Sequence, residues 1–510
     1  MNSSMQPETK EAIYIYLIAA IAVWVTYIIW HNRRLPPGPW GIPIFGYLLW
    51  LDPKSPYLTL TNLAKKYGSV YGLKLGNVYT VVLTDPKVIK TVFSKDATTG
   101  RAPLYLTHGI MNGYGLICSE GDLWKEHRRF TFNTLRQFGG TKVGGTQRKK
   151  METLILLHAL DFVKHIDLDI DSEIDIVPSL RHSLGSVINM IVFGTSWSRD
   201  NELWIWLQNL QEEGPKHLGV AGPMNFLPFF RFFPKYRNII SFIKTNLHKT
   251  HEVYHELIDQ QIKLLQTTAG TTSLDNVDTS TGQNFIQCFV LEKLKKTDEN
   301  VRQLYNDTQF VYLLADIFGA SLDTTLTSLR WYFLFMAKNQ TIQTEVRKEL
   351  EEVLQRRPAS MEDINQLPLF EASVLETMRI RPVVPIGIPH GSVEEMEIEG
   401  YRIPKGTMIV MLQWALHMDE KVWENPNEFN PRRFINSEGK VEKSEYFVPF
   451  QVGKRMCVGE ELARMFLFLF TSTILQNFSF SLRDENFDTW GECGITLTPY
   501  DYKLIVEKIK

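Results

Sequence analysis

The stretch Phe450–Gly459 constrains this chain more than any other feature, because it places a cysteine where a loop turns into a helix. Cys457 lies in FQVGKRMCVG, which is followed at once by EELARMFL, a composition typical of a helix start. The free backbone amides and the positive dipole end at such a position favour a thiolate, and Arg455 adds a formal cation. Gly453 and Gly459 let the backbone come close to a flat or bulky group.

A lone cysteine at a helix end is most often a small buried apolar residue. Here the pattern Phe-x-x-Gly-x-Arg-x-Cys-x-Gly sets five positions at once. At a usage of about 5% per residue type, chance produces it in only about 10⁻⁴ of chains of this length. The stretch resembles the haem-ligand loop of the cytochrome P450 family. The resemblance implies a haem b site in which Cys457 is the axial thiolate ligand of iron and Phe450, Gly453 and Arg455 contribute to cofactor binding.

The bulk composition allows one large core and argues against nucleic acid as a partner. The chain has 510 residues, is 44% hydrophobic and carries a net charge of -2 with 22% charged residues. No repeat is evident, so we expect one large catalytic domain rather than several modules. The four cysteines are too few and too scattered for a disulfide framework or a zinc cluster, which fits a reducing, cytosol-facing compartment.

An apolar segment near the N-terminus predicts a transmembrane helix. Residues 12–30 are 19 residues without a charge, about 28 Å of helix and close to the ~30 Å core of a bilayer. A cleaved signal peptide is the alternative, but the preceding residues carry acids as well as a lysine and no small-residue cleavage site follows. We expect residues 1–31 to be a retained anchor, and Arg33 and Arg34 to leave the rest of the chain in the cytosol.

Residues 32–46 are proline-rich and predict a stiff hinge between this anchor and a domain formed by residues 47–510. Microsomal members of the family carry a similar segment, so the resemblance places the protein on the endoplasmic reticulum membrane. Within the domain, a helix over Tyr57–Tyr67 is followed by strand-like runs over Ser69–Leu75 and Val78–Leu83. Small sheet elements amid long helices indicate a fold that is mainly α with small β-sheets.

Trp124 and Arg128 lie four residues apart in GDLWKEHRRF, on one face of a predicted helix. A tryptophan against an arginine is usually surface packing. The family has a Trp-x-x-x-Arg helix whose two side chains bind a haem propionate, and the match extends to the preceding residues. The resemblance also places Arg101 and His390 where relatives make propionate contacts.

Residues 306–338 predict a long apolar helix with polar residues in its middle, GASLDTT. A buried acid beside hydroxyls is costly without a partner, and a threonine can bond back to a carbonyl one turn earlier and bend the helix. A self-stabilised kink is therefore one interpretation. The other is the family's oxygen-binding helix, in which Asp323 and Thr324 match the acid and the threonine that relay protons. Ser321 stands where many members have glycine, which makes the oxygen groove tighter or adds a hydroxyl.

Glu376 and Arg379 form an acid–base pair at i,i+3, and Arg433 follows in PRRF at the family's spacing. A glutamate held between these two arginines would be a well-paired buried network that stabilises the haem-side core.

Two further segments bear on the substrate. The glycine-rich, apolar residues 104–115 match the loop that caps the substrate cavity in relatives. Residues 221–234, AGPMNFLPFFRFFP, are broken by three prolines and cannot form one regular helix. This aromatic stretch is either packed core or an exposed loop that dips into the bilayer beside the anchor.

The resemblance as a whole implies a haem-thiolate monooxygenase that takes electrons from NADPH through NADPH–cytochrome P450 reductase, with cytochrome b5 as a second partner, and oxidises a lipophilic small molecule. The thiolate favours O–O cleavage. Lys125, Arg129 and Lys454 are candidates for a basic docking face.

Finer placement rests on YLTHGIMNGYG at 105–115, on EEG at 212–214 and on the residues of 219–229. These resemble the insect microsomal branch, within clan 2, that inactivates ecdysteroid hormones by 26-hydroxylation. Three alternatives stay open: a clan relative that oxidises a sesquiterpenoid hormone or foreign compounds; a haem-thiolate isomerase or dehydratase, against which the Asp323–Thr324 pair argues; and a non-catalytic haem-binding protein, which needs no proton relay.

Overall fold

The computed structural model describes residues 33–509 apart from 143–144, 167–172, 218–221, 271–272 and 275–281, together with Tyr16, Ala19 and Val23. The predicted anchor over residues 12–30 thus falls almost wholly outside the described residues. Among those that are described, no helix is long and apolar enough to cross a membrane.

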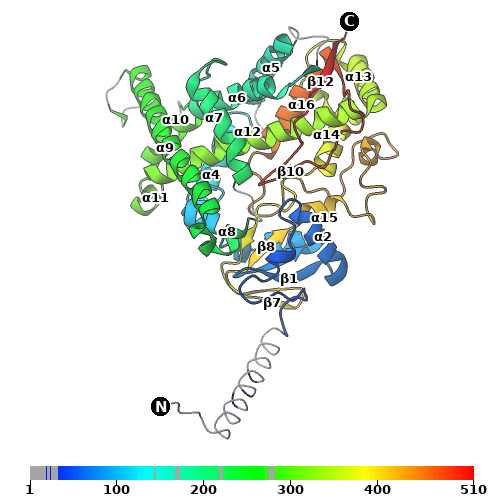
Figure 1. Ribbon diagram of the computed structural model, residues 1–510. Helices are drawn as coiled ribbons and strands as arrows, with labels where there is room; N and C mark the ends of the chain where they lie inside the picture. Colours follow the sequence, from blue (N-terminus) through cyan, green and yellow to red (C-terminus); the bar gives the residue numbers. More distant parts are fainter. Residues whose placement is uncertain are drawn as a thin grey trace.

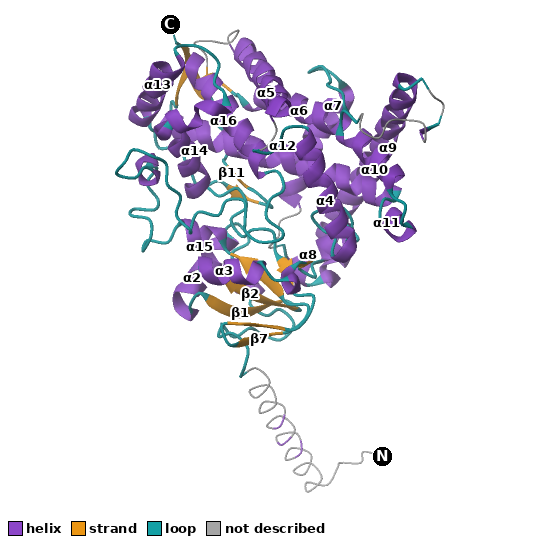
Figure 2. Cartoon of the chain, turned by 180° about the vertical axis from the view of Figure 1, so that it is seen from behind, coloured by secondary structure: helices purple, strands orange, loops and turns teal. Residues whose placement is uncertain are grey.

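The fold is a helical body resting on a smaller sheet-rich end, as expected for a mainly α protein with small sheets (Figures 1 and 2). The helices are α2 (Pro56–Tyr67), α3 (Pro86–Phe93), α4 (Gly121–Gln137), α5 (Gly145–Ile166), α6 (Val177–Phe193), α7 (Glu202–His217), α8 (Pro223–Phe226), α9 (Pro234–Thr268), α10 (Phe285–Lys295), α11 (Glu299–Gln303), α12 (Asp307–Lys338), α13 (Gln340–Leu354), α14 (Pro368–Ile380), α15 (Gln413–His417) and α16 (Glu460–Asn477).

The strands form four small sheets. They are β1 (Val70–Leu75), β2 (Val78–Leu83), β3 (Gly100–Arg101), β4 (Glu173–Ile174), β5 (His390–Gly391), β6 (Met396–Ile398), β7 (Tyr401–Ile403), β8 (Met408–Met411), β9 (Phe478–Ser481), β10 (Glu492–Cys493), β11 (Leu497–Thr498) and β12 (Leu504–Lys508). A five-stranded sheet has the order β1-β2-β8-β5-β3, a three-stranded sheet has the order β4-β12-β9, and β6-β7 and β10-β11 are two-stranded.

The first hairpin has the predicted register. Val70 pairs with Leu83 and Leu75 with Val78, so the turn falls at Gly76-Asn77 as the sequence indicates. The β2 strand then pairs in parallel with β8, more than three hundred residues further along the chain. This pairing brings the region after α14 beside the N-terminal part of the domain, which sequence periodicity alone does not reveal.

The residues after the predicted anchor form neither helix nor long strand, but they are bonded to the sheet-rich end. The Pro37 carbonyl accepts from the Gly72 amide of β1 at 2.8 Å, and the Arg34 carbonyl accepts from the Arg402 amide of β7 at 2.7 Å. The proline-rich segment is therefore fastened along the edge of the domain, which fixes where any preceding segment leaves it.

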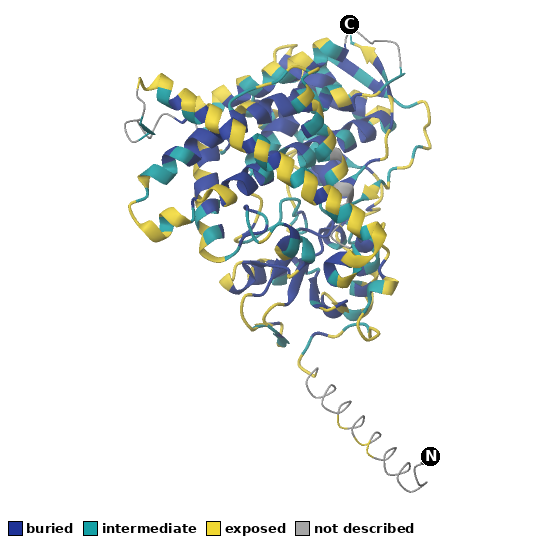
Figure 3. Cartoon of the chain, turned by 60° about the vertical axis from the view of Figure 1, so that its left-hand side comes forward, coloured by how far each residue is buried: buried dark blue, intermediate teal, exposed yellow. Residues whose placement is uncertain are grey.

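The long helix α12 crosses the middle of the helical body (Figure 1). Asn306 caps it by accepting from the Gln309 amide at 2.8 Å, so the predicted start at residue 306 is confirmed. Most of its side chains are buried, and it packs against α6, α9, α14 and α16. Figure 3 shows the same division, with buried positions inside the helical body and exposed positions over its outer surface. Side chains on α12 are thereby held at fixed positions in the core.

The aromatic stretch is broken as its prolines require. Met224, Phe226 and Leu227 are buried, whereas the short 3-10 helix Pro228–Phe232 has no buried residue. Phe232 is 72% exposed and Phe233 51% exposed. The stretch therefore contributes to the core at its start, as the first interpretation predicts, and presents phenylalanines to the outside at its end, which is the exposure that the second interpretation requires.

Candidate active site

The Cys457 loop is held by its own backbone and by α3. The Cys457 amide donates to the Phe450 carbonyl at 2.9 Å, and the Lys454 amide donates to the Phe93 carbonyl at 3.0 Å. Gly453 has a φ of 82°, and a side chain there would collide with the Phe93 carbonyl. Only glycine serves at this position, because it tolerates both the left-handed backbone and the close approach. The cysteine is thus presented from a fixed loop directly before α16.

The electrostatics of the Cys457 thiol differ from the sequence expectation. Its side chain is exposed, but the surrounding protein raises its pKa above the usual thiol value. The Gly459 amide and the Arg128 guanidinium lower the pKa in part, and Glu460 raises it. The helix-start amide lowers the pKa of the thiol, as predicted. The prediction that the position favours the thiolate is nevertheless wrong, because desolvation raises the pKa by more than the amide lowers it. The contributing cation is Arg128 rather than Arg455.

Trp124, Arg128 and Arg455 form one cluster beside this loop. The Arg455 guanidinium lies over the Trp124 ring at 4.6 Å, and Arg128 lies 5.9 Å from the same ring. Arg128 donates to the Met456 carbonyl at 2.8 Å, which ties α4 to the cysteine loop, and Arg455 donates to the Ser119 carbonyl. Trp124 and Arg128, which the sequence places on one helical face, therefore lie beside Arg455, which is more than three hundred residues away in the chain.

Arg101 and His390 face each other across neighbouring strands, because they are paired positions of β3 and β5. The Arg101 guanidinium donates to the carbonyls of Ile117, at 2.6 Å, and Ile388, at 3.2 Å. His390 Nδ1 lies 2.8 Å from the Thr98 carbonyl, which can only accept, so Nδ1 carries the proton. Burial and the nearby Arg101 hold the pKa of His390 well below its ordinary value, so the ring is neutral and Nε2 is its free acceptor.

The charges of this region call for an anion. Burial and the like charges of Arg101 and Arg128 lower the pKa of Arg455, and burial lowers that of Arg101, while Glu120 and Asp316 offset these effects in part. Both guanidinium groups keep their proton. Nε and Nη1 of Arg455 are buried without a hydrogen-bond partner. Buried guanidinium groups that repel one another and keep unused donors are stable only with an opposite charge nearby. A ligand with carboxylate arms fits this requirement.

The cysteine adds the second requirement. No group of three or more metal-ligating side chains gathers within the described part of the chain. A thiolate is a good ligand for iron, but a metal held at Cys457 must bring its other ligands with it. A macrocycle that carries iron and has carboxylate arms, such as haem b, satisfies both the thiolate and the cation cluster.

On α12, the Thr324 hydroxyl donates to the Ala320 carbonyl at 2.7 Å, the backbonding expected from the sequence. The Asp323 carboxylate accepts from the Thr496 hydroxyl, and burial raises its pKa to about 6. Thr496 directly precedes β11, so the structure brings the C-terminal region to the middle of α12. Ser321 is half-buried and shares the middle of the helix with this pair.

Asp316, seven residues before Asp323 on the same helix, was missed by the sequence reasoning. Its carboxylate accepts from the amides of Leu116, at 2.6 Å, and Ile117, at 2.8 Å. Gln309 bonds the Gly115 amide and carbonyl at 2.9 and 3.0 Å. These contacts clamp residues 115–117 to α12. A second acid two turns earlier in a buried helix was the available signal.

The predicted core network is confirmed. Glu376 accepts from Arg379 at 2.7 Å and from Arg433 at 3.1 Å, and the side chains of Glu376 and Arg379 are fully buried. Arg379 also donates to the carbonyls of His417 and Pro426 at 2.8 Å each, and the Asn430 amide donates to Glu376 at 3.0 Å. The donors and acceptors named here all find partners, as a buried ion pair requires.

The three cations suggested for docking are each paired with a nearby acid. Lys125 lies 3.9 Å from Asp122, Arg129 lies 2.5 Å from Glu126, and Lys454 lies 2.7 Å from Asp96. A partner's acidic groups would have to compete with these local acids for the same charges.

The fold and this site define a haem-thiolate protein, and comparison with known proteins identifies the family. The family model described as Cytochrome P450 matches residues 36–506. Cytochrome P450 306a1 of Drosophila melanogaster is 39% identical, covering 93% of this chain and 89% of the relative. Cytochrome P450 18a1 of the same species is 34% identical over 97% and 91%, and cytochrome P450 2K4 of Oncorhynchus mykiss is 31% identical over 92% and 91%.

The chain therefore belongs to the cytochrome P450 family. It is a monooxygenase, an oxidoreductase that uses haem b with iron, and its relatives include clan 2-type members. Enzymes of this family receive electrons from a redox partner and act on lipophilic substrates.

Proposed function

We propose that this protein hydroxylates a steroid, with 26-hydroxylation of an ecdysteroid as the particular reaction, and thereby inactivates the hormone. Electrons would come from NADPH through NADPH–cytochrome P450 reductase, with cytochrome b5 as an additional donor. The protein would be anchored in the endoplasmic reticulum by residues 1–31, joined through the hinge at 32–46 to a cytosolic catalytic domain over 47–510.

The cation cluster carries the assignment of the cofactor site. When bound, haem b would supply the oxidising chemistry. Cys457 would be its iron ligand, while Arg101, Trp124, Arg128, His390 and Arg455 would hold its carboxylate arms. The unused Nε and Nη1 of Arg455 are donors available for them, whereas Nε2 of His390, an acceptor in the neutral ring, would bond a carboxylate arm only when one of the two groups carries an additional proton. Phe450 and Gly453 would hold the loop that aims the thiolate.

Proton delivery would be the task of α12. The Asp323 carboxyl, with a pKa raised by burial to about 6, can hold a proton or release it near neutral pH. The Thr324 hydroxyl donates its one hydrogen to the Ala320 carbonyl, so it can accept a hydrogen bond as it stands and would turn away from that carbonyl to donate onward. Neither role requires a change in the packing of the helix.

The steroid assignment rests on the resemblance of residues 105–115, 212–214 and 219–229, of which Gly219–Ala221 lie outside the described residues. An apolar cluster supports it, because Ile110, Met224 and Ile243 pack together with residues of 105–111 and 236–240. A glycine on α12 supports a substrate with hydroxyl groups. The Gln211 amide of α7 approaches Gly319 so closely that a Cβ there would lie 3.0 Å from its oxygen. An amide at this point of the helix can bond a hydroxyl on a large apolar skeleton.

Exposed apolar side chains support the membrane assignment. Trp40 is 86% exposed, Ile44 64%, Leu49 64% and Phe232 72%. The segments that carry them meet at the β1–β2 turn, since the Gly76 amide donates to the Phe45 carbonyl and the Asn77 amide to the Phe226 carbonyl. A surface of this kind, beside the point where the N-terminal segment leaves the domain, suits contact with a bilayer.

The first test is the carbon monoxide difference spectrum of the reduced, membrane-expressed protein, repeated with Cys457→Ser. We expect the Soret band that gives the family its name, and its loss in the variant. A folded wild-type protein without this band would overturn the thiolate assignment.

The second test incubates the enzyme with NADPH and reductase on ecdysteroids, a sesquiterpenoid hormone and a set of foreign lipophiles, and identifies the products. Hydroxylation at the primary C-26 of an ecdysteroid is expected. Oxidation at the neighbouring tertiary carbon would support the assignment of a steroid substrate and contradict the assignment of the position that is hydroxylated. Turnover of only the sesquiterpenoid or the foreign compounds would reject the steroid.

A further inference from the structure

A segment of the C-terminal region runs along α12 from Asp323 to the far end of the helix. Thr496 bonds the Asp323 carboxylate, and the Leu497 carbonyl accepts from the Trp331 indole at 2.8 Å. Beyond β11, the Tyr502 hydroxyl donates to the Arg330 carbonyl at 2.6 Å. The segment from 496 to 502 and two turns of α12 are therefore fastened together at both ends.

Arg330 is a fixed cation inside this arrangement. One of its terminal nitrogens donates to the Pro499 carbonyl at 3.2 Å and to Asp501 at 3.0 Å. The Arg330 side chain is only 11% exposed, whereas Asp501 is 98% exposed. The Arg330 Nε is buried without a hydrogen-bond partner. Because a guanidinium does not lose its proton in proteins, the charge is permanent.

Arg330 and Asp323 are seven residues apart and so lie on the same face of α12, two turns from each other. Their charges interact. Burial raises the pKa of Asp323, whereas the Thr496 hydroxyl and then the charges of Arg330 on α12 and Arg181 on α6 lower it. These are the polar and charged groups that act on the carboxyl, and Arg330 is the one on its own helix.

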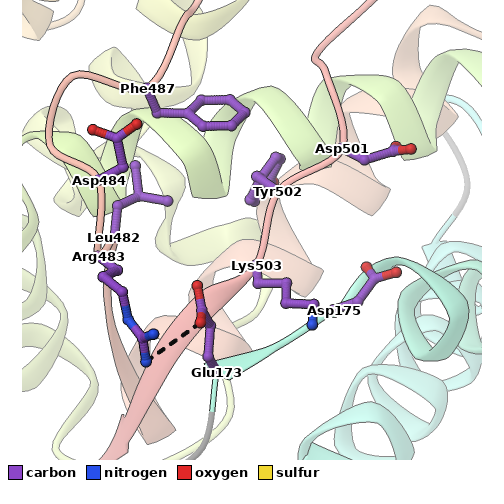
Figure 4. Close-up of a pocket in the computed structure, with 9 residues that line it drawn as sticks. All are labelled: Glu173, Asp175, Leu482, Arg483, Asp484, Phe487, Asp501, Tyr502 and Lys503. Atoms are coloured by element: carbon purple, nitrogen blue, oxygen red, sulfur yellow. Dashed lines mark ion pairs between the residues drawn. The ribbon is translucent and has the colours of Figure 1, made fainter.

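Asp501, the partner of Arg330, lines a pocket at the surface, of about 300 Å³. Figure 4 shows Asp501 and Tyr502 on one side of it, Glu173 and Asp175 across from them, and the ion pair between Arg483 and Glu173. Arg330 is therefore linked to this pocket through Asp501.

We propose that Arg330 is a positioning residue for Asp323, and that Asp501 and the Pro499 carbonyl, at the rim of this pocket, keep its charge at the right place. This inference rests on the proposed role of Asp323 in proton delivery. Arg330 opposes the cost of ionising a buried carboxyl, so that Asp323 can lose its proton as well as hold it near neutral pH.

The test measures the titration of Asp323 in the full-length protein. The infrared band of the protonated Asp323 carboxyl is assigned as the carboxyl band that disappears in Asp323→Asn. Arg330→Gln should raise the pKa of Asp323 by about one unit, since Coulomb's law at an effective dielectric constant of about 20 gives an effect of this order for opposite charges two helical turns, about 10 Å, apart. The pH at which turnover falls on the alkaline side should rise by the same amount. An unchanged pKa in a folded Arg330→Gln protein overturns the proposal.

Arg330→Lys keeps the charge, so the pKa of Asp323 should stay close to the wild-type value, and a rise as large as in Arg330→Gln overturns the electrostatic role. If Arg330→Gln does not fold, Arg330→Met removes the charge instead, and an unchanged pKa in that variant overturns the proposal. Arg347→Gln is the matched control, because Arg347 on α13 also has a buried, unpartnered Nε and should leave Asp323 unchanged. If Asp323→Asn leaves turnover and its pH profile intact, the delivery role fails. The infrared shift in Arg330→Gln still decides the electrostatic link separately.

Discussion

Two buried groups of arginines in this protein differ in what surrounds them. Around Glu376, Arg379 and Arg433 meet a carboxylate and several backbone carbonyls. Around Trp124 lies the group of Arg101, Arg128 and Arg455. Glu120 and Asp316 act on the guanidinium groups of Arg101 and Arg455 only through their charge, without an ion pair among the described contacts, and two nitrogens of Arg455 have no partner. The first group is complete within the chain and stabilises the fold. The second group needs a ligand to supply the opposite charge. Burying its like charges costs free energy of folding, which is the reason for expecting an anionic cofactor there.

The largest effect should come from breaking the complete network. Glu376→Ala leaves two buried guanidinium groups without their carboxylate and should destabilise the protein by about 3–5 kcal/mol. Denaturant unfolding, with and without haem, measures this loss, which should be the same in both forms. A loss under about 1 kcal/mol would mean that the network contributes no more than a surface pair.

Asp316 tests a second complete arrangement, in which an acid satisfies two backbone amides. Asp316→Ala at pH 5 should cost about 2–4 kcal/mol, because the buried amides of Leu116 and Ile117 lose their acceptor. Asp316→Asn keeps an acceptor oxygen and serves as the control. Equal stability of the two variants would show that the clamp on residues 115–117 does not depend on this side chain.

The pH dependence of stability should separate Asp316→Asn from the wild type. Burial raises the pKa of Asp316 from 3.8 to about 6, so the folded state binds more protons than the unfolded state between these values. Stability therefore falls as pH rises through this window, by about 3 kcal/mol for one such group. Asp316→Asn should remove this share of the slope, leaving the part due to Asp323. A slope identical to the wild type would contradict the assignment.

Arg455→Met is the variant that best tests whether the two groups of arginines differ. Removing a buried cation with unused donors should leave the haem-free protein as stable as before or more stable, whereas haem affinity should fall by tenfold or more, about 1.4 kcal/mol or above. Haem titration and unfolding of the haem-free form measure the two effects. If the haem-free protein lost as much stability as it does in Glu376→Ala, the two groups of arginines would be alike.

The smallest effect on stability is expected at the surface. Lys454→Gln removes an ion pair with Asp96 that is open to solvent, so unfolding should change by less than about 1 kcal/mol. If Lys454 belongs to the docking face, the KM for reductase should rise, and more so at low salt. Lys440→Gln is a suitable control, because Lys440 forms an exposed ion pair with Glu438 and has no expected part in docking. Equal KM values for both variants would remove Lys454 from the docking face.

The residues near the cysteine show how far the sequence could be read. The loop, the Trp124–Arg128 face, the buried glutamate network and the start of α12 were predicted because each lies within a short motif or follows helical or strand periodicity. The net effect on the Cys457 thiol was not, because desolvation depends on everything packed around the loop rather than on the helix start alone. Asp316 and Arg330 were missed for the same reason: their partners, Leu116, Ile117 and Asp501, are about two hundred residues away in the chain.

The sequence by itself determined the class of protein, since the cysteine motif and the helix with Asp323 and Thr324 are local patterns that chemistry restricts to few residue types. Only the tertiary structure decided which buried charges have all their partners within the chain and which keep unpaired donors. The i,i+3 spacing of Glu376 and Arg379 predicts that Arg379 meets a carboxylate, but nothing along the chain tells that Arg455 keeps two unpartnered nitrogens. The cost of a buried charge depends on what surrounds it in space.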